Sequence, residues 1–183
     1  KYMNLDFVMI NLSWRCDNSL QGNDNCPYCW VAQTNIDRNI IIDRNLDQWF
    51  TALQRHFQPH TTFDFVGGEP TLVPGFHEFL HKISKVYRWA ITSNMGGDRW
   101  SKFYTDRLKS CVSWTASYHH AGKDSIEEFI FEDLESFGFV PEENMEINLA
   151  IDRFSYENDE NFLQRLADSV QMAAVLPVCS RIA

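Results

Sequence analysis

Strand-like apolar runs alternate with amphipathic helical segments along the whole chain, and this alternation limits the possible folds more than any other feature. The strands are expected over residues 5–14, 61–66, 87–94, 111–120 and 145–152, and MAAVLPV (172–178) is expected to open a sixth. Single helices between successive strands indicate right-handed, parallel βαβ units. The sequence therefore predicts an α/β fold with a parallel sheet, either open and doubly wound or closed as a barrel.

The helical segments each carry one apolar face. Residues 45–57 place Leu46, Trp49, Phe50, Leu53 and Phe57 together, after Asn45 as a possible N-cap. Residues 74–87 do the same with Phe76, Phe79, Leu80 and Ile83. Further helices are expected around 100–108, 124–139 and 158–170. No linker or shift in composition divides the chain, so we expect one domain over 1–183, with the chain stopping near the sixth strand.

Charge and composition narrow the possible partners and surroundings. The 183 residues carry a net charge of −9, which argues against a broad nucleic-acid face or an anionic membrane surface. No stretch approaches the roughly 20 apolar residues of a membrane span, and the start lacks the features of a signal peptide. The cysteines are odd in number, five in all, with one tight cluster. We therefore expect a reducing, cytoplasmic protein whose clustered thiols bind a metal.

Three cysteines stand close together just after the first predicted strand. Cys26 and Cys29 form C-x2-C, and Cys16 precedes them across a loop rich in Asn, Asp and Gly. Three thiolates without a fourth suit either a [4Fe–4S] cluster with one exposed iron or a zinc ion with a non-cysteine ligand. The alternative is a set of unused loop thiols. Of the remaining cysteines, Cys111 is expected in the core. Cys179 is expected as a spare thiol, and the less favoured alternative is a ligand for something beyond this chain.

A second motif, FVGGEPTL (65–72), follows the second predicted strand. Gly67 and Gly68 allow a ligand to approach the backbone closely, and Pro70 stiffens the exit. Glu69 offers a carboxylate suited to an ammonium group. The alternative is a tight strand-to-helix turn with an exposed Glu. Both motifs stand at carboxyl ends of strands, where parallel α/β folds carry their reactive groups.

Together these motifs resemble those of the radical S-adenosylmethionine (radical SAM) enzymes. The resemblance is carried by CPYCW preceded by Cys16, by GGEPTL, and more weakly by ITSN, SYHHAGKDSIEEF and EINLAID, over about residues 6–176. It implies a partial (β/α)6 TIM-like barrel. It also implies that Cys16, Cys26 and Cys29 bind three irons of a [4Fe–4S] cluster, while S-adenosylmethionine chelates the fourth iron. The family spacing is C-x3-C-x2-C, whereas this chain has C-x9-C-x2-C.

The resemblance also implies residues that hold S-adenosylmethionine. Tyr28 would contact the adenine region, and Glu69 with the backbone of Gly67 and Gly68 would hold the methionine ammonium. The polar groups for the ribose and the methionine carboxylate would be Ser93 and Asn94, or Ser117. Weaker candidates are Asn148 and Asp152 for the ribose or adenine and Arg153 for the carboxylate.

The implied activity is reductive cleavage of S-adenosylmethionine to a 5′-deoxyadenosyl radical, which abstracts hydrogen from an unidentified substrate. That substrate is expected to be a small molecule or a peptide, with flavodoxin or ferredoxin as electron donor. His119 and His120 are read either as substrate or proton-transfer groups or as loop residues capping a helix. Two other functions stay open. One is a zinc-stabilised binding module that uses the three cysteines and a residue such as His119, and the other is an Fe–S electron-transfer protein.

Overall fold

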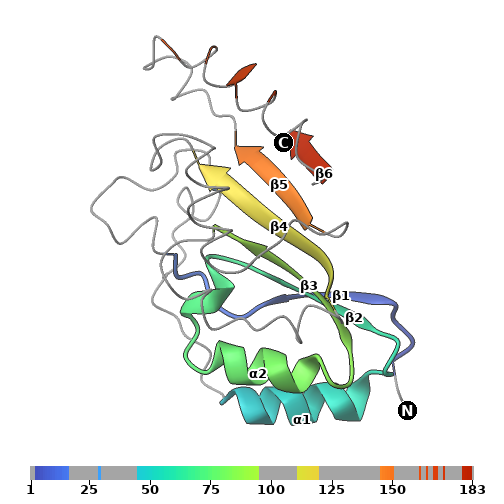
Figure 1. The fold of residues 1–183 in the computed structure, drawn as a ribbon. Helices are drawn as coiled ribbons and strands as arrows, with labels where there is room; N and C mark the ends of the chain where they lie inside the picture. Colours follow the sequence, from blue (N-terminus) through green and yellow to red (C-terminus); the bar gives the residue numbers. More distant parts are fainter. Residues whose placement is uncertain are drawn as a thin grey trace.

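A six-stranded, fully parallel sheet forms the framework of the protein in the computed structural model (Figure 1). The structure describes residues 3–16, 29, 45–94, 111–119, 145–150 and 179–182, with positions 161, 164, 167, 168 and 171. The strands are β1 (Phe7–Asn11), β2 (Thr62–Val66), β3 (Arg88–Ser93), β4 (Cys111–His119), β5 (Met145–Ala150) and β6 (Cys179–Ile182). The helices are α1 (Leu46–His56), the short 3-10 helix η2 (Pro70–Leu72) and α2 (Phe76–Ile83).

Strand order distinguishes between the two architectures that the sequence allows. The strands lie in the order β1-β2-β3-β4-β5-β6, so each new strand is added on the same side of the preceding one. In a doubly wound sheet, the order in which strands are added would instead reverse at a switch point. The fold is thus α/β with an open parallel sheet, as expected for a partial (β/α)6 barrel, and the predicted fold class is confirmed.

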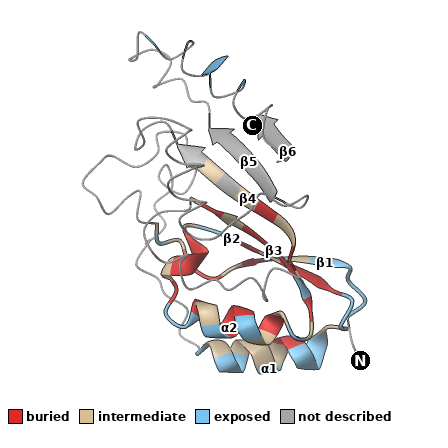
Figure 2. Ribbon diagram, in the orientation of Figure 1, coloured by how far each residue is buried: buried red, intermediate tan, exposed pale blue. Residues whose placement is uncertain are grey.

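Helices α1 and α2 cover one face of the sheet, and the core lies between these helices and the sheet (Figures 1 and 2). Phe65 of β2 meets Phe76 and Phe79 of α2 edge to face, with ring centroids 5.6 and 5.7 Å apart. All four apolar residues predicted for the second helix, from Phe76 to Ile83, are buried. Trp89 of β3 is also fully buried, and it lies opposite Phe63 of β2 in the sheet register. This layer fixes β1, β2 and β3, whose ends carry the candidate site.

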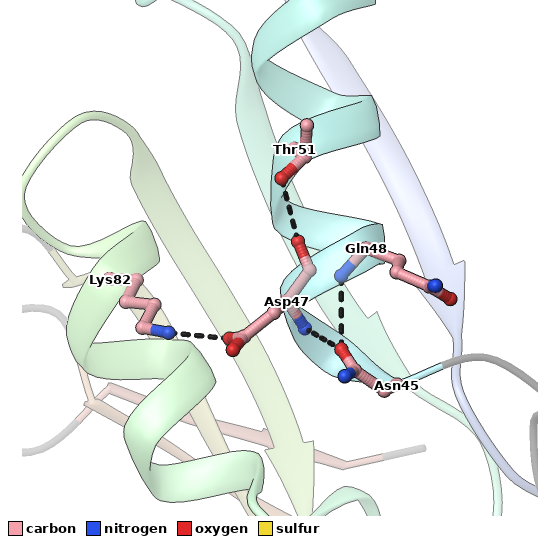
Figure 3. Close-up of polar contacts among 5 residues, drawn as sticks. All are labelled: Asn45, Asp47, Gln48, Thr51 and Lys82. Carbon is pink, nitrogen blue, oxygen red and sulfur yellow. Dashed lines mark hydrogen bonds and ion pairs between the residues drawn. The ribbon is translucent and has the colours of Figure 1, made fainter.

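Helix α1 begins where the sequence predicts. The side chain of Asn45 accepts hydrogen bonds from the backbone N–H groups of Asp47 and Gln48, at 2.7 and 3.1 Å, as an N-cap does (Figure 3). The Asp47 carboxylate also pairs with Lys82 of α2, which ties the two helices together at their exposed side (Figure 3). Of the predicted apolar face, Leu53 is buried and the other four residues pack against the core.

The later elements are described in part. Gln164, Ala167 and Asp168 are helical, in agreement with the helix expected over 158–170. The sixth strand occupies Cys179–Ile182, directly after the run that was expected to open it, and residues 172–178 lie outside the described ones, as do the helices expected around 100–108 and 124–139. None of the helices in the described part of the chain has the length and hydrophobicity of a membrane span.

Candidate functional site

Three chain segments meet at the carboxyl edge of the sheet. They are residues 12–16 after β1, residues 67–69 after β2, and Asn94 directly after β3. Because β1, β2 and β3 are parallel neighbours, their carboxyl ends lie at one edge. The first cysteine, the GGEP turn and the end of ITSN are therefore brought together, although the chain separates them by dozens of residues.

Backbone hydrogen bonds join the first two segments. The N–H of Gly68 donates to the carbonyl of Ser13 at 3.0 Å, and the N–H of Glu69 donates to the carbonyl of Arg15 at 2.7 Å. The segment after β1 is itself held by local hydrogen bonds, since the Ser13 N–H donates to Asn11 Oδ1 at 3.1 Å and the Arg15 N–H donates to Ser13 Oγ at 3.0 Å. The GGEP turn thus fixes the backbone immediately before Cys16.

The two glycines are required by this close approach. A Cβ on Gly68 would lie 2.1 Å from the Arg15 carbonyl oxygen, and one on Gly67 would lie 2.5 Å from Asn11 Oδ1. Gly67 also has φ of 135°, which L side chains rarely adopt. The sequence explained both glycines by the approach of a ligand, whereas the structure shows the chain's own backbone in that space. Contact of their backbone with a ligand stays a prediction.

Glu69 is fully buried, so the alternative of a plain turn with an exposed Glu is wrong. Its Oε1 accepts hydrogen bonds from the Thr71 N–H at 3.2 Å and the Thr71 hydroxyl at 2.6 Å. The Ser93 hydroxyl donates to Oε1 and Oε2 at 2.9 and 3.0 Å, and the Asn94 N–H donates to Oε2 at 2.8 Å. Glu69 therefore connects the turn after β2 to the end of β3.

The electrostatic state of Glu69 follows from this environment. Burial raises the pKa of Glu69 above its ordinary value of 4.5, because the charged carboxylate loses its hydration. The hydrogen bonds from Thr71, Asn94 and Ser93 act in the opposite direction. Among the described residues, every group that donates to this carboxylate is neutral. A cationic ligand group beside Glu69 would compensate the buried charge.

Asn94 makes a second contact at this site. While its backbone N–H is bound by Glu69, its side-chain Nδ2 donates to the Sγ of Cys16 at 3.7 Å. Amide-to-sulfur hydrogen bonds are longer than those to oxygen because sulfur is larger. The structure thus connects the buried carboxylate, through Asn94, to the first thiol of the cysteine motif.

The cysteines predicted to bind the metal are described in part. Cys16 and Cys29 are of intermediate exposure, and Cys26 lies outside the described residues, as does Tyr28. Within the described ranges, which do not include Cys26, no three His, Cys, Asp or Glu side chains gather as metal ligands. Cys111 begins β4 and is 7% exposed, so its assignment to the core is confirmed.

The remaining predicted residues lie further along the sheet. Ser117 of β4 and Asn148 of β5 are direct partners in the strand register, and Ser117 is half-buried. His119 is the last residue of β4. The three other candidates, His120, Asp152 and Arg153, lie outside the described residues. The structure therefore brings Glu69, Ser93 and Asn94 into one network with Cys16, and it puts Ser117 and Asn148 on neighbouring strands.

Sequence reasoning missed Thr71 and Asp64. Thr71 supplies two of the hydrogen bonds to Glu69, and its position two residues after Glu69 in the GGEPTL motif was the available signal. Asp64 stands in the middle of β2, between the fully buried Phe63 and Phe65. Since side chains alternate along a strand, Asp64 lies on the face opposite the helices. Burial raises the pKa of Asp64. The sequence signal for this residue was a carboxyl group inside an otherwise apolar strand.

Comparison with known proteins supports the fold. No protein-family model matches the chain, and neither does any curated protein sequence. Two solved structures of Streptococcus suis SuiB share this α/β architecture at 15% sequence identity. SuiB bound to precursor peptide SuiA has a TM-score of 0.57 over 93% of this chain. SuiB bound to S-adenosylmethionine has a TM-score of 0.53 over 97%. The chain spans 38% of the length of each.

Proposed function

We propose that this chain is the core of a radical SAM enzyme, in which Cys16, Cys26 and Cys29 hold a [4Fe–4S] cluster and the neighbouring strand ends bind S-adenosylmethionine. One observation carries this proposal. The Glu69 N–H donates to the Arg15 carbonyl at 2.7 Å, so the GGEP turn lies directly beside the residue that precedes Cys16. The GGEP turn and the first cysteine of the proposed cluster motif are thus neighbours in space.

The side chains present suit such a cluster. Thiolates are the usual ligands of Fe–S clusters, and Cys16 and Cys29 would supply two of them. Partial exposure of both thiols leaves them accessible to iron and to a cosubstrate. When bound, the cluster would supply one electron for reductive cleavage of S-adenosylmethionine, which yields the 5′-deoxyadenosyl radical that abstracts hydrogen from a substrate.

The protein's own groups would bind and orient the cosubstrate. Glu69 is the expected partner of the methionine ammonium, and its raised pKa and neutral donors are what a carboxylate awaiting a cation would show. The carboxylate is fully buried, however, so the ammonium would reach it only if the Ser93 hydroxyl turned away from one oxygen. Ser117 and Asn148, together at one register position, suit the ribose or the methionine carboxylate. Tyr28 and the backbone of Gly67 and Gly68 keep their predicted roles.

The substrate is proposed to be a peptide or a small molecule. Support for a peptide is the likeness of the fold to SuiB, which has been solved with a precursor peptide. A flavodoxin or ferredoxin would supply the electron. The odd number of cysteines, with one tight cluster, supports a reducing, cytoplasmic setting.

An anaerobic assay tests the proposal. The purified protein is reconstituted with iron and sulfide, reduced with dithionite and mixed with S-adenosylmethionine, and 5′-deoxyadenosine is measured by mass spectrometry. We expect the nucleoside with the wild-type protein and none with Cys26→Ala. Cys111→Ala is the matched control, because Cys111 is a core residue of β4 and should not affect iron loading. Bound zinc without a cluster would contradict the proposal and favour a zinc-stabilised binding module.

A further inference from the structure

The contacts of Asn94 suggest a role that differs from ligand binding. Two of its donor groups point to two different partners, since the backbone N–H donates to Glu69 Oε2 at 2.8 Å and the side-chain amide donates to Cys16 Sγ at 3.7 Å. Cys16 lies 78 positions away in the sequence. The side-chain amide of Asn94 is therefore already directed at a sulfur atom of the cysteine motif.

Glu69 fixes the position from which Asn94 makes this contact. The carboxylate is fully buried and accepts hydrogen bonds from both sides, from Thr71 after β2 and from Ser93 and Asn94 at the end of β3. Hydrogen bonds from backbone N–H to a carboxylate are strong when water is excluded. The Asn94 backbone is thus held in one place, from which its side-chain amide reaches Cys16.

The segment that carries Cys16 is held from the same turn. Gly68 and Glu69 donate to the carbonyls of Ser13 and Arg15, so the backbone on the amino side of Cys16 is bound to the residues that position Asn94. Both ends of the amide-to-sulfur contact are therefore anchored to the GGEP turn.

An N–H group directed at a ligating sulfur has a known electrostatic effect. Reduction adds negative charge to an Fe–S cluster and its thiolates, and an N–H dipole stabilises that added charge. A hydrogen bond to a ligand sulfur therefore raises the reduction potential of the cluster, and its removal lowers the potential. Asn94 is the described residue whose side-chain N–H is seen to donate to Cys16.

We infer that Asn94 is a positioning residue that raises the reduction potential of the cluster through its hydrogen bond to Cys16, and that Glu69 holds Asn94 in place for this purpose. This inference rests on the proposed function, because it requires Cys16 to be a cluster ligand. It gives Glu69 and Asn94 a task in the protein besides binding S-adenosylmethionine.

The test compares cluster potentials. Wild type, Asn94→Ala and Asn94→Asp are reconstituted, their iron content is measured, and the potential is determined by redox titration followed by electron paramagnetic resonance, without S-adenosylmethionine. We expect a more negative potential in both variants, with the larger shift in Asn94→Asp, since aspartate keeps the shape but replaces the N–H donor with a negative charge. Asn45→Ala is the control, because loss of the α1 N-cap destabilises the fold without touching Cys16.

A second measurement needs no cluster. In metal-free protein labelled with ¹⁵N, the side-chain amide resonance of Asn94 should shift on Cys16→Ala and stay unchanged on Cys111→Ala. This measurement tests the contact between Asn94 and Cys16 even if neither Asn94 variant holds iron. An Asn94 amide resonance that Cys16→Ala leaves unchanged would overturn the inference.

The outcomes separate the two proposals. If wild type and both variants hold a cluster at the same reduction potential, the inferred role of Asn94 is contradicted while the proposed function stands. If wild type binds no iron, the proposed function fails and the inference fails with it. A negative shift in the Asn94 variants that Asn45→Ala does not reproduce supports both.

Discussion

Ser93 donates its hydroxyl hydrogen bond to the carboxylate of Glu69, at 2.9 Å from one oxygen and 3.0 Å from the other, although 24 positions separate the two residues. Both side chains are almost completely removed from water. Burying a carboxylate is costly unless it is well hydrogen-bonded, so Ser93, Thr71 and the Asn94 N–H act as a set. This relationship makes Glu69 a structural link between β2 and β3 before any ligand is considered.

The first prediction concerns the stability of this link. Glu69→Ala should lower the free energy of unfolding by about 2–4 kcal/mol, because it leaves buried donors without an acceptor. Glu69→Gln should cost less, because it keeps the volume and one acceptor oxygen. Urea denaturation of the metal-free protein measures both. Glu78→Ala, at an exposed position of α2, is the control and should change the free energy by about 0.5 kcal/mol or less. A cost for Glu69→Ala no larger than that of the control would contradict the structural role.

The second prediction is a pH dependence. Burial raises the pKa of Glu69 above 4.5, so between pH 4.5 and the raised pKa the folded protein keeps a proton that the unfolded chain releases. Stability from this group is therefore highest below that window and falls as pH rises through it. The free energy of unfolding of wild type minus that of Glu69→Gln should decrease as pH rises from 4.5, because Gln does not titrate. Urea titrations of both proteins at several pH values measure this difference, and a constant difference would show that the pKa is not raised.

Much of the fold could be predicted because it depends on local patterns. The apolar spacing of α2 and the N-cap at Asn45 are visible within a few residues, and both agree with the structure. The parallel sheet follows from the alternation of strands and helices. The sequence predicts the position of β6 less well, because Cys179–Ile182 has only one strongly apolar residue, Ile182. This strand is defined by its pairing with β5.

The hydrogen-bond network could not be predicted because it depends on register between strands. The sequence marks Glu69, Ser93 and Asn94 as candidates, but nothing local indicates that one carboxylate binds the other two residues. The reason for Gly68 could not be predicted either. The sequence indicated room for a ligand, whereas the structure shows that the absent side chain makes room for the Arg15 carbonyl. Long-range contacts of this kind appear only when β1, β2 and β3 are aligned.

The third prediction tests that close approach. Gly68→Ala would place a methyl group 2.1 Å from the Arg15 carbonyl oxygen, and backbone atoms cannot rotate away as a side chain would. We expect a loss of about 3 kcal/mol in unfolding free energy, together with weaker iron loading, since the segment before Cys16 must shift. Gly75→Ala is the matched control. Its φ of 77° costs about 1–2 kcal/mol, but the new Cβ meets only Leu46 at 3.7 Å, so iron loading should stay normal. Equal iron loading in the two variants would mean that the GGEP turn does not position Cys16.

The fourth prediction concerns the cysteine spacing, where this chain departs from the family it resembles. Cys26→Ala and Cys29→Ala should abolish the absorbance of the reconstituted cluster, and Cys16→Ala should do the same if the C-x9-C-x2-C motif supplies all three ligands. The structure favours Cys16, because the Asn94 amide and the backbone contacts of the GGEP turn hold it at the carboxyl edge of the sheet. Iron and sulfide analysis of each variant, with Cys111→Ala as the control, measures the effect. A full cluster in Cys16→Ala would show that the first ligand is another residue, and the contact between Asn94 and Cys16 would then lie beside the cluster and not on it.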